Sequence, residues 1–491
     1  MSRNVQNLHV PFRGGVDLIT PATSLDPGAA LLAINYECPI EGGYRSVAGY
    51  LALGSVPGQG PILGVAVWKG EPYAIRQINP GSTANLYRWT GASTWVEAGT
   101  ELPVGRYEFA IGNLFATAAS EALYMVCPNG KPFEWDGTTF AQLTGAQSGA
   151  SYIRVHKNHL FLGFEAGSLQ HSALGDPTDW TTDSGAGEIG AQDQISGLAL
   201  APGGVLVMFG RDSIQALYGS SSEDWELRSL SANTGARAYT VAEMRQPIFI
   251  NERGVTNLEA TEVFGDFIQS DLTRQVQPLF SNDYRPVCAC VSKERSQYLV
   301  WDDTGRGLRV TISGNQVLGV TTTEFPHVPT TCAVGETIGG DEVAVFGDAA
   351  GNVFRLDQGT SFNGAAIEST LVTAFNHCGS PTARKRFRRV FLESVGADSV
   401  DLTVLPSFDY DDWQIARHFR SAETLAAGGR WGFSDWDGFV WDGPYQSETP
   451  ISISGTAVNI NLSFHHSSAV NAPHTIRGYT LHYTPRRLRR G

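Results

Sequence analysis

Short apolar runs that end in polar or glycine turns dominate the chain. Leu63, Val65 and Val67 alternate with smaller partners before a Lys69-Gly70 turn, as expected of a half-buried strand. The run Val205-Leu-Val-Met-Phe209 is apolar throughout, as expected of a strand covered on both faces. The pattern predicts an all-β protein.

Helix signals are few and short. Asp26 is placed to cap a helix over residues 27–35, which would have Pro27 at its first position. Ser270 is placed to cap a second helix over residues 271–277, which Pro278 would end. Each predicted helix is shorter than about ten residues, so neither changes the predicted fold class.

The apolar strand cores recur at a nearly constant interval. Their first residues are Tyr73, Tyr124, Leu160, Leu206, Ile248, Tyr298 and Val343, which lie on average 45 residues apart. A four-stranded propeller blade takes roughly 40–50 residues. We therefore expect a β-propeller over residues 59–365, with about seven blades and a count good to within one.

Large aromatic residues mark a second position in the first four repeats, namely Trp95, Phe140, Trp180 and Trp225. One twisted four-stranded sheet cannot bury both of its faces alone, so neighbouring blades must cover them. We expect these aromatic side chains to pack between blades, in preference to stacking on a ligand.

Two further regions flank the repeats. Residues 1–58 are rich in glycine and proline and form an N-terminal arm, which is expected to pack on or between subunits. Residues 366–491 contain segments with period-2 alternation, such as Val400-Asp-Leu-Thr-Val404, and predict a β-sandwich-like domain.

The net charge is −14, yet part of the basic charge is clustered in two runs. The first run is Arg384, Lys385, Arg386, Arg388 and Arg389, and the second is Arg486, Arg487, Arg489 and Arg490. The overall acidity argues against a sequence-reading DNA-binding protein. The two runs are interpreted as interface or solvated arginines at a domain joint and a chain end, with phosphate contact as the alternative.

An aromatic and aspartate-rich segment lies between the predicted strands of the C-terminal domain. It contains Trp431, Trp436 and Trp441, with aspartates interleaved among them. The composition favours an interface or a platform for sugars, and a local core folded back on itself is an equally good interpretation.

Motifs for chemistry are weak. Gly185-Ala-Gly187-Glu-Ile-Gly190 matches a dinucleotide-binding pattern, but no helical pattern follows it to receive a pyrophosphate. His465 and His466 would point to opposite faces of a strand, and Asp409, Asp411 and Asp412 lack the glycine and glutamate of a calcium loop. No nucleophile and base come together, so we expect no enzyme activity, no cofactor and no metal.

The cysteine content and the lengths of the apolar runs indicate the compartment in which the protein is made. Six cysteines in 491 residues do not make a disulfide framework, and Cys288 and Cys290 are expected to be buried thiols on one strand face. No apolar run is long enough to span a membrane, and the first residues lack the apolar core of a signal peptide. Synthesis in a reducing cytoplasm is the expectation.

The two ends of the chain resemble a known family. At the N-terminal end, the resemblance rests on Gly14-Gly15-Val-Asp17-Leu18, Pro21, Leu25-Asp-Pro27-Gly28, Ala33-Ile-Asn35-Tyr, Gly42-Gly43-Tyr-Arg45 and Gly49-Tyr50. At the C-terminal end, it rests on Ser463-Phe-His-His and on Thr475-Ile-Arg-Gly-Tyr-Thr-Leu-His-Tyr-Thr-Pro485-Arg-Arg. These segments resemble the tail nozzle proteins of short-tailed bacteriophages, which are also called packaged-DNA stabilisation or head-to-tail stopper proteins.

The resemblance covers roughly the first 50 and last 100 residues, and the aromatic segment 431–441 has no counterpart in the family pattern. It implies a structural virion protein, made in the host bacterial cytoplasm and located in the virion tail. Such proteins form a homohexamer below the portal and adaptor rings and contact tail fibres or tip proteins. The ring would retain packaged double-stranded DNA and let it pass on infection, without sequence-specific binding.

Two other classes of function stay open. A receptor-binding or glycan-binding tail-tip or fibre protein would use the aromatic segment on a host glycan. A propeller glycosidase would need paired carboxylates on the propeller axis at a fixed separation, which no sequence motif supplies.

Overall fold

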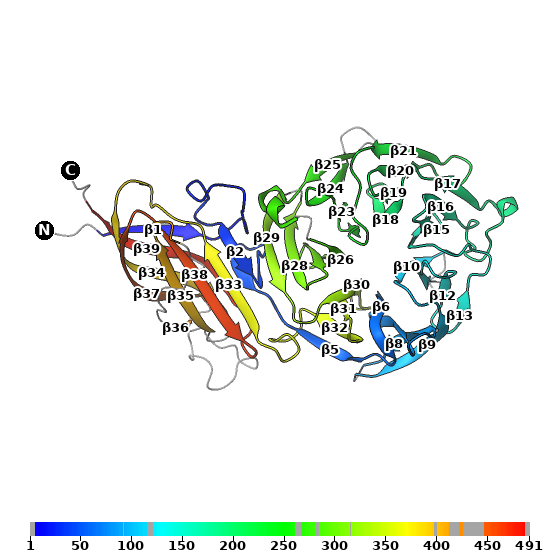
Figure 1. The fold of residues 1–491 in the computed structure, drawn as a ribbon, viewed down its shortest axis with the longest axis horizontal. Coiled ribbons are helices and arrows are strands. Elements are labelled where there is room, and N and C mark those ends of the chain that lie inside the picture. The colour runs from blue at the N-terminus through cyan, green and yellow to red at the C-terminus, as the bar shows by residue number, and fades with distance from the viewer. Residues whose placement is uncertain are drawn as a thin grey trace.

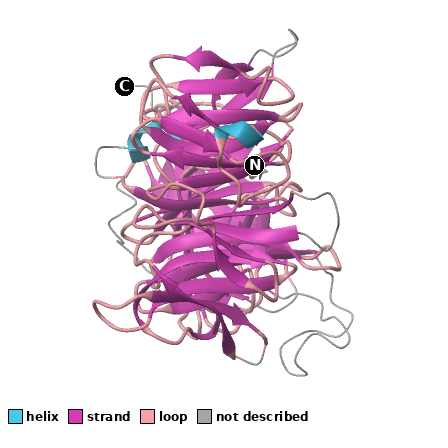
Figure 2. Cartoon of the chain, turned by 90° about the vertical axis from the view of Figure 1, so that its right-hand side faces the viewer, coloured by secondary structure: helices cyan, strands magenta, loops and turns pink. Residues whose placement is uncertain are grey.

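Strands make up nearly all of the regular structure (Figure 2). The computed structural model describes residues 5–91, 93–114, 121–260, 267–280, 284–314, 316–396, 400–411, 422–425 and 446–486. These residues form a propeller of antiparallel sheets around a common axis, and a β-sandwich beside it (Figure 1). The all-β propeller predicted from the sequence is confirmed, and the described residues form seven blades.

Each of the first four blades is a four-stranded sheet whose strands follow chain order from the axis outward. Blade 1 contains β6 (Gln59–Trp68), β7 (Glu71–Gln77), β8 (Ala84–Trp89) and β9 (Trp95–Leu102). Blade 2 contains β10 (Glu108–Asn113), β11 (Glu121–Val126), β12 (Phe133–Trp135) and β13 (Phe140–Gln142). Blade 3 contains β14 (Tyr152–His156), β15 (His159–Phe164), β16 (Ser168–His171) and β17 (Gly187–Gly190). Blade 4 contains β18 (Ile195–Ala201), β19 (Val205–Gly210), β20 (Ile214–Tyr218) and β21 (Glu226–Ser231).

The last three blades complete the circle. Blade 5 contains β22 (Ala242–Glu243), β23 (Pro247–Ile250), β24 (Val255–Ala260) and β25 (Phe267–Asp271). Blade 6 contains β26 (Pro286–Ser292), β27 (Gln297–Asp302), β28 (Arg306–Ser313) and β29 (Gln316–Glu324). Blade 7 contains β30 (Pro329–Glu336), β31 (Glu342–Asp348), β32 (Asn352–Leu356) and β5 (Tyr50–Ser55). Every repeated strand core found in the sequence is the second strand of its blade.

The outermost strand of blade 7 comes from the N-terminal arm. β5 pairs with β32 in antiparallel register, from Leu356 opposite Tyr50 to Asn352 opposite Ser55. The circle of blades is therefore closed by hydrogen bonds between chain segments that lie about 300 residues apart. The predicted arm of residues 1–58 is divided between the two domains, because its earlier strands belong to the sandwich.

The sandwich is built from two sheets that combine the arm with the C-terminal region. One sheet contains β1 (Gln6–Pro11), β3 (Tyr36–Glu37), β4 (Tyr44–Ser46), β39 (Thr475–Pro485), β34 (Lys385–Val395) and β37 (Gln446–Ala457). The other contains β2 (Ala30–Ile34), β33 (Ile367–Thr373), β38 (Ile460–Ser468), β35 (Val400–Phe408) and β36 (Ala422–Leu425). β2 also pairs in parallel with β29, so the second sheet continues blade 6.

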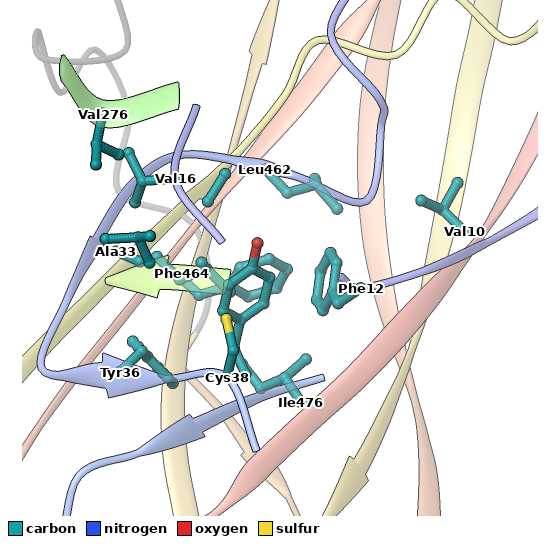
Figure 3. Packing of buried hydrophobic residues seen from close by; sticks show 14 of the residues in the cluster. Val10, Phe12, Val16, Ala33, Tyr36, Cys38, Val276, Leu462, Phe464 and Ile476 are labelled. Atoms are coloured by element: carbon teal, nitrogen blue, oxygen red, sulfur yellow. The ribbon is translucent and has the colours of Figure 1, made fainter. Parts of the chain in front are cut away.

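The core between the two sheets forms around Phe12 (Figure 3). The centre of its ring lies 5.5 Å from the ring centres of Tyr44 and Tyr479 and 6.0 Å from that of Phe464. These residues come from the arm and from β4, β38 and β39. The arm is therefore an integral part of the sandwich core, not a strap on its surface.

The inter-blade role predicted for the repeated aromatic residues is confirmed. A Cβ atom at Gly99 of blade 1 would lie 2.5 Å from the ring of Phe140 of blade 2, so the ring fills the space that a side chain would need. The Trp225 ring lies 4.4 Å from the ring of His171 in blade 3, and the Trp95 indole N–H donates to the Gly54 carbonyl at 3.2 Å.

The helix predicted for residues 27–35 is wrong. Asp26 does accept a hydrogen bond from the Gly28 N–H at 2.9 Å, but the bond closes a local turn. The chain then enters β2, where it pairs with β29 and β33. The ladder bonds and core contacts available to a strand outweigh a weak helix propensity here.

The helix predicted for residues 271–277 forms as a 3₁₀ helix over Arg274–Phe280, with a kink at Val276, while Asp271 still belongs to β25. The predicted ends were therefore wrong at both sides, and Pro278 lies inside the helix. A second 3₁₀ helix, Thr182–Ser184, precedes β17.

A buried charge cluster joins the sandwich to blade 6. Glu37 of β3 is fully buried, and its carboxylate lies within 3.1 Å of guanidinium nitrogens from Arg45, Arg295 and Arg309. Burial alone raises the pKa of Glu37, but Arg309, Arg295 and Arg45 outweigh it and hold the pKa below that of an ordinary glutamate. We name Glu37 and its three arginines the junction cluster.

We expect Glu37→Gln to lower the free energy of unfolding by about 3–5 kcal/mol, because three arginines lose their buried partner. The stabilisation from Glu37 is present above the unfolded-state pKa of about 4.3 and is lost as pH falls through the lower folded-state pKa. Urea unfolding of both proteins at pH 7 and at pH 3 measures this difference. Glu41→Gln, at an exposed position of the same β3–β4 turn, is the control, and an equal loss in both variants would contradict the prediction.

We expect Tyr50→Ala to destabilise the closure of the propeller by about 3–5 kcal/mol, the usual cost of deleting a buried aromatic side chain. The Tyr50 ring lies within 5.7 Å of five other rings, those of Phe325, His327, Phe346, Phe354 and Phe362. Tyr50→Phe removes only the 2.8 Å hydrogen bond to His327 and should cost about 1 kcal/mol. Hydrogen exchange of the β5 amides tests the prediction, which fails if exchange is unchanged in Tyr50→Ala.

Candidate interaction surfaces

The structure places Arg486, the first residue of the second basic run, beside the first run. β34 and β39 are antiparallel neighbours, with Lys385 opposite Pro485 and Arg386 opposite Thr484. The Arg486 N–H donates to the Arg384 carbonyl at 2.8 Å. β1 begins and β39 ends at the end of the sandwich that is remote from the propeller (Figure 1).

Alternation along β34 separates one buried lysine from the exposed arginines. Lys385 is 2% exposed, and its ammonium donates to the carbonyls of Ser380 and, at 2.7 Å, of Val458. Burial lowers the pKa of Lys385. Lys385 therefore stabilises the sandwich and is not available to a partner.

The other members of the first run lie on the surface. Arg384 pairs with Asp409 at 3.3 Å, and the Arg388 Nε donates to the Thr484 hydroxyl at 3.1 Å. A bulge between Phe387 and Arg389 lets both Phe387 and Val390 point into the core, which leaves Arg386 and Arg389 exposed. We name this surface the basic edge and define it by five residues, Arg384, Arg386, Arg388, Arg389 and Arg486.

Seven of the residues that the sequence singled out lie outside the described residues. They are Asp412, Trp431, Trp436, Trp441, Arg487, Arg489 and Arg490. The motif residues that can be placed have structural partners. Gly187 and Gly190 belong to β17, and Asp409 accepts a hydrogen bond from the Val458 N–H at 2.7 Å.

The propeller axis is crossed by side chains that no sequence motif revealed. Arg106, in the loop before β10 of blade 2, reaches across to blade 5, where its guanidinium carbon lies 3.5 Å from the centre of the Tyr239 ring. Arg106 also donates to the Thr330 carbonyl at the start of blade 7, at 3.4 Å. One side chain therefore links three blades across the axis.

A second crossing involves Arg154 of blade 3, whose Nε lies 3.1 Å from the Glu243 carboxylate of blade 5. Glu243 also accepts a hydrogen bond from the Leu200 N–H of blade 4 at 2.7 Å. Glu108 lies beside these groups, 3.9 Å from Arg106, and burial raises the pKa of Glu108. We name these residues, Arg106, Glu108, Arg154, Tyr239 and Glu243, the axial brace.

Two carboxylates thus line the axis, as a glycosidase would require, but both are engaged with arginines. Glu243 is held by Arg154 and a backbone N–H, and Glu108 lies between the charges of Arg106 and Arg154. Charge-paired groups of this kind brace the blades against one another. The sequence offered no signal for them, because each residue comes from a different repeat and the contacts form only when the circle closes.

The described residues contain no cluster of three or more histidine, cysteine, aspartate or glutamate side chains placed to hold a metal ion. All six cysteines are free thiols, and Cys288 and Cys290 share one apolar cluster between blades 6 and 7, which confirms that they lie on the same strand face. Within the described part of the chain, no helix has the length and apolarity of a membrane span.

Comparison with known proteins identifies no family for this chain. No family model matches the chain, and no curated protein matches it. Among solved structures, 1037 chains match. The WD40 β-propeller domain of Doa1 is 10% identical, with a TM-score of 0.43, and the match covers 63% of this chain and 97% of that one.

Other matches have similar values. YCF48 bound to D1 peptide is 12% identical, with a TM-score of 0.39, and the match covers 62% of this chain and 95% of that one. Virginiamycin B lyase from Staphylococcus aureus is 11% identical, with a TM-score of 0.43, and the match covers 61% and 95% of the two chains. At these identities and TM-scores the matches identify neither a family nor a function.

We expect Lys385→Met to lower the free energy of unfolding by about 1–3 kcal/mol, because two buried carbonyls lose their charged donor. Arg386→Met, one position along the same strand, should change it by less than about 0.5 kcal/mol. Urea unfolding of the two variants makes the comparison. Equal losses would contradict the division of this run into a buried lysine and a surface made of arginines.

Proposed function

We propose that this chain is a structural virion protein, a tail nozzle subunit of a short-tailed bacteriophage. It would form a ring, a homohexamer by resemblance, that retains packaged DNA and lets the DNA pass on infection. The observation that carries the proposal concerns the two chain ends that resemble this family. Although more than 400 residues separate them, β1 pairs with β39 along six consecutive positions and β2 pairs with β33, which β38 follows in the same sheet.

The family-like glycines occupy positions where close backbone contact requires them. A Cβ atom at Gly15 would lie 2.3 Å from the Val320 nitrogen of blade 6, and one at Gly49 would lie 2.1 Å from the Ser361 carbonyl oxygen. Both contacts occur where the arm meets the propeller. The residues that carry the resemblance therefore determine how the two domains join, which supports a likeness of architecture.

The axial brace bears on where DNA would pass. Arg106 and Arg154 reach residues of non-adjacent blades across the propeller axis, so this axis offers no route for a duplex. In the proposed ring, the DNA channel lies between subunits and the propellers form its wall. A net charge of −14 on each subunit disfavours tight binding of phosphates along such a channel, which suits a conduit.

The basic edge is the proposed docking surface for the adaptor ring or a neighbouring subunit. Its arginines project from the end of the sandwich, on an otherwise acidic chain, where they can meet an acidic partner surface. Lys385 is excluded from this role by its burial, and Arg384 is already paired with Asp409. Arg386, Arg388 and Arg389 therefore carry the test.

We expect the triple variant with Arg386→Gln, Arg388→Gln and Arg389→Gln to impair assembly of the ring or its attachment to particles. Once particles have formed, their retention of DNA should be unchanged. The control replaces Arg211, Arg253 and Arg274, three exposed propeller arginines, and removes the same charge. Complementation of a phage that lacks the protein, followed by particle counts and a nuclease test for leaked DNA, measures both effects. Particles that assemble normally yet leak DNA would reverse the assignment.

The assembled form of the wild-type protein tests the function itself. We expect a particle with six times the subunit mass of 52.9 kDa and an axial hole about as wide as duplex DNA, as seen by mass photometry and electron microscopy. A monomer or a fibre that binds host glycans on an array would overturn the nozzle and favour a receptor-binding tail protein.

A further inference from the structure

A cavity of about 550 Å³ opens at one mouth of the propeller axis, above the axial brace. It is lined by three loops that lead into the innermost strands of blades 2, 5 and 6, and by Asp303 in the turn between β27 and β28. The three loops contribute one arginine each, Arg106, Arg237 and Arg285. We name this cavity the axial mouth.

Two of the three guanidinium groups are held in place by the protein. Arg106 stacks on the Tyr239 ring and donates to the Thr330 carbonyl, while Arg237 donates to the Tyr284 carbonyl at 2.7 Å. A guanidinium has five N–H donors, so each of these two groups keeps donors for a ligand. The Arg285 side chain is exposed and has no hydrogen bond or ion pair within the described residues.

The charge balance of the cavity differs from that of the protein. Three guanidinium groups line the cavity with one carboxylate, that of Asp303, and Glu108 lies behind Arg106 at 3.9 Å, in a chain whose net charge is −14. A neighbouring cavity, lined by Arg211, Arg237 and Arg253, contains equally many acidic residues, Glu165, Asp212 and Glu252. The excess of positive charge is therefore specific to the axial mouth and is not a property of this whole face.

The rest of the lining places apolar atoms beside the arginines. Pro286 and Val287 are half-buried, and Ala238 is exposed. Apolar surface next to a few fixed polar groups is typical of small-molecule sites. Guanidinium groups bind phosphate and carboxylate oxygens in the same forked geometry.

We propose that the axial mouth is a binding site for a small oxyanion, a ligand that presents a phosphate or carboxylate group to Arg106, Arg237 and Arg285. The site does not depend on the proposed nozzle function, because it is formed within one subunit. Phosphate and carboxylate share the recognition chemistry, so the experiment contains one arm for each.

The experiment titrates the full-length protein with inorganic phosphate, and separately with citrate, at an ionic strength held constant with sodium chloride. Isothermal titration calorimetry gives the dissociation constants. We expect saturable binding of at least one of the two anions, and the stronger arm identifies the preferred group. Arg285→Gln should weaken that binding about tenfold, since it removes a charge-assisted contact.

Two further variants make the test independent of folding. Arg253→Gln, which removes an exposed arginine from the neighbouring cavity, should leave the dissociation constant unchanged. Asp303→Asn should tighten binding several-fold, because it removes the one carboxylate of the axial mouth, and a variant that binds more tightly cannot be an unfolded one. The proposal is overturned if the wild-type protein shows no saturable binding of either anion. It is also overturned if Arg285→Gln and Arg253→Gln weaken binding equally.

Discussion

The buried carboxylate of Glu37 is the constraint on which the joining of the two domains depends. An isolated buried charge costs several kcal/mol, so Glu37 is tolerated only where its partners surround it. Arg45 comes from the sandwich, and Arg295 and Arg309 come from blade 6. Arg295 and Arg309 also lie within 3.8 Å of the carboxylate of Asp357, which directly follows β32 of blade 7. The sandwich and two blades must therefore be in their native positions before all of these charges are satisfied.

The N-terminal arm covers the exposed edge strands of two blades. An open circle of blades would leave β32 with unpaired backbone groups, and β5 pairs with them. The outer strand of blade 6 is covered in the same way, because β2 lies beside β29 and the Asn35 N–H donates to the Thr322 carbonyl at 2.9 Å. Between these two strands the chain passes through Glu37, so the junction cluster fixes the position of both.

The parts of the fold that could be predicted from the sequence are those with local signals. The second strand of every blade is a short apolar run buried on both faces, which is why the interval near 45 residues identified all seven blades. The sequence contained no local signal that β5 belongs to blade 7. Tyr50-Leu-Ala-Leu has the pattern of an ordinary strand, and only its pairing with the distant β32 assigns it to that blade. The predicted helix over residues 27–35 failed for the same reason, since a cap and a proline are local features whereas the pairing of β2 is not.

The candidate surfaces also differ in whether a local sequence signal predicted them. Both arginine runs were visible in the sequence, but only the pairing of β34 with β39 brings Arg486 beside the first run. Only the alternation along β34 removes Lys385 from that surface. The axial brace and the axial mouth were invisible, because their residues come one at a time from separate blades.

The side chains that cross the propeller axis have a functional consequence. Because side chains of distant blades meet across the axis, the propeller is braced against deformation, and passage of a large molecule through it would break the charge pairs of Arg154 and Glu243. A rigid propeller whose axis is crossed by side chains serves best as a wall or a platform. Any moving part of the proposed assembly must then lie outside the propeller core, in the loops or between subunits.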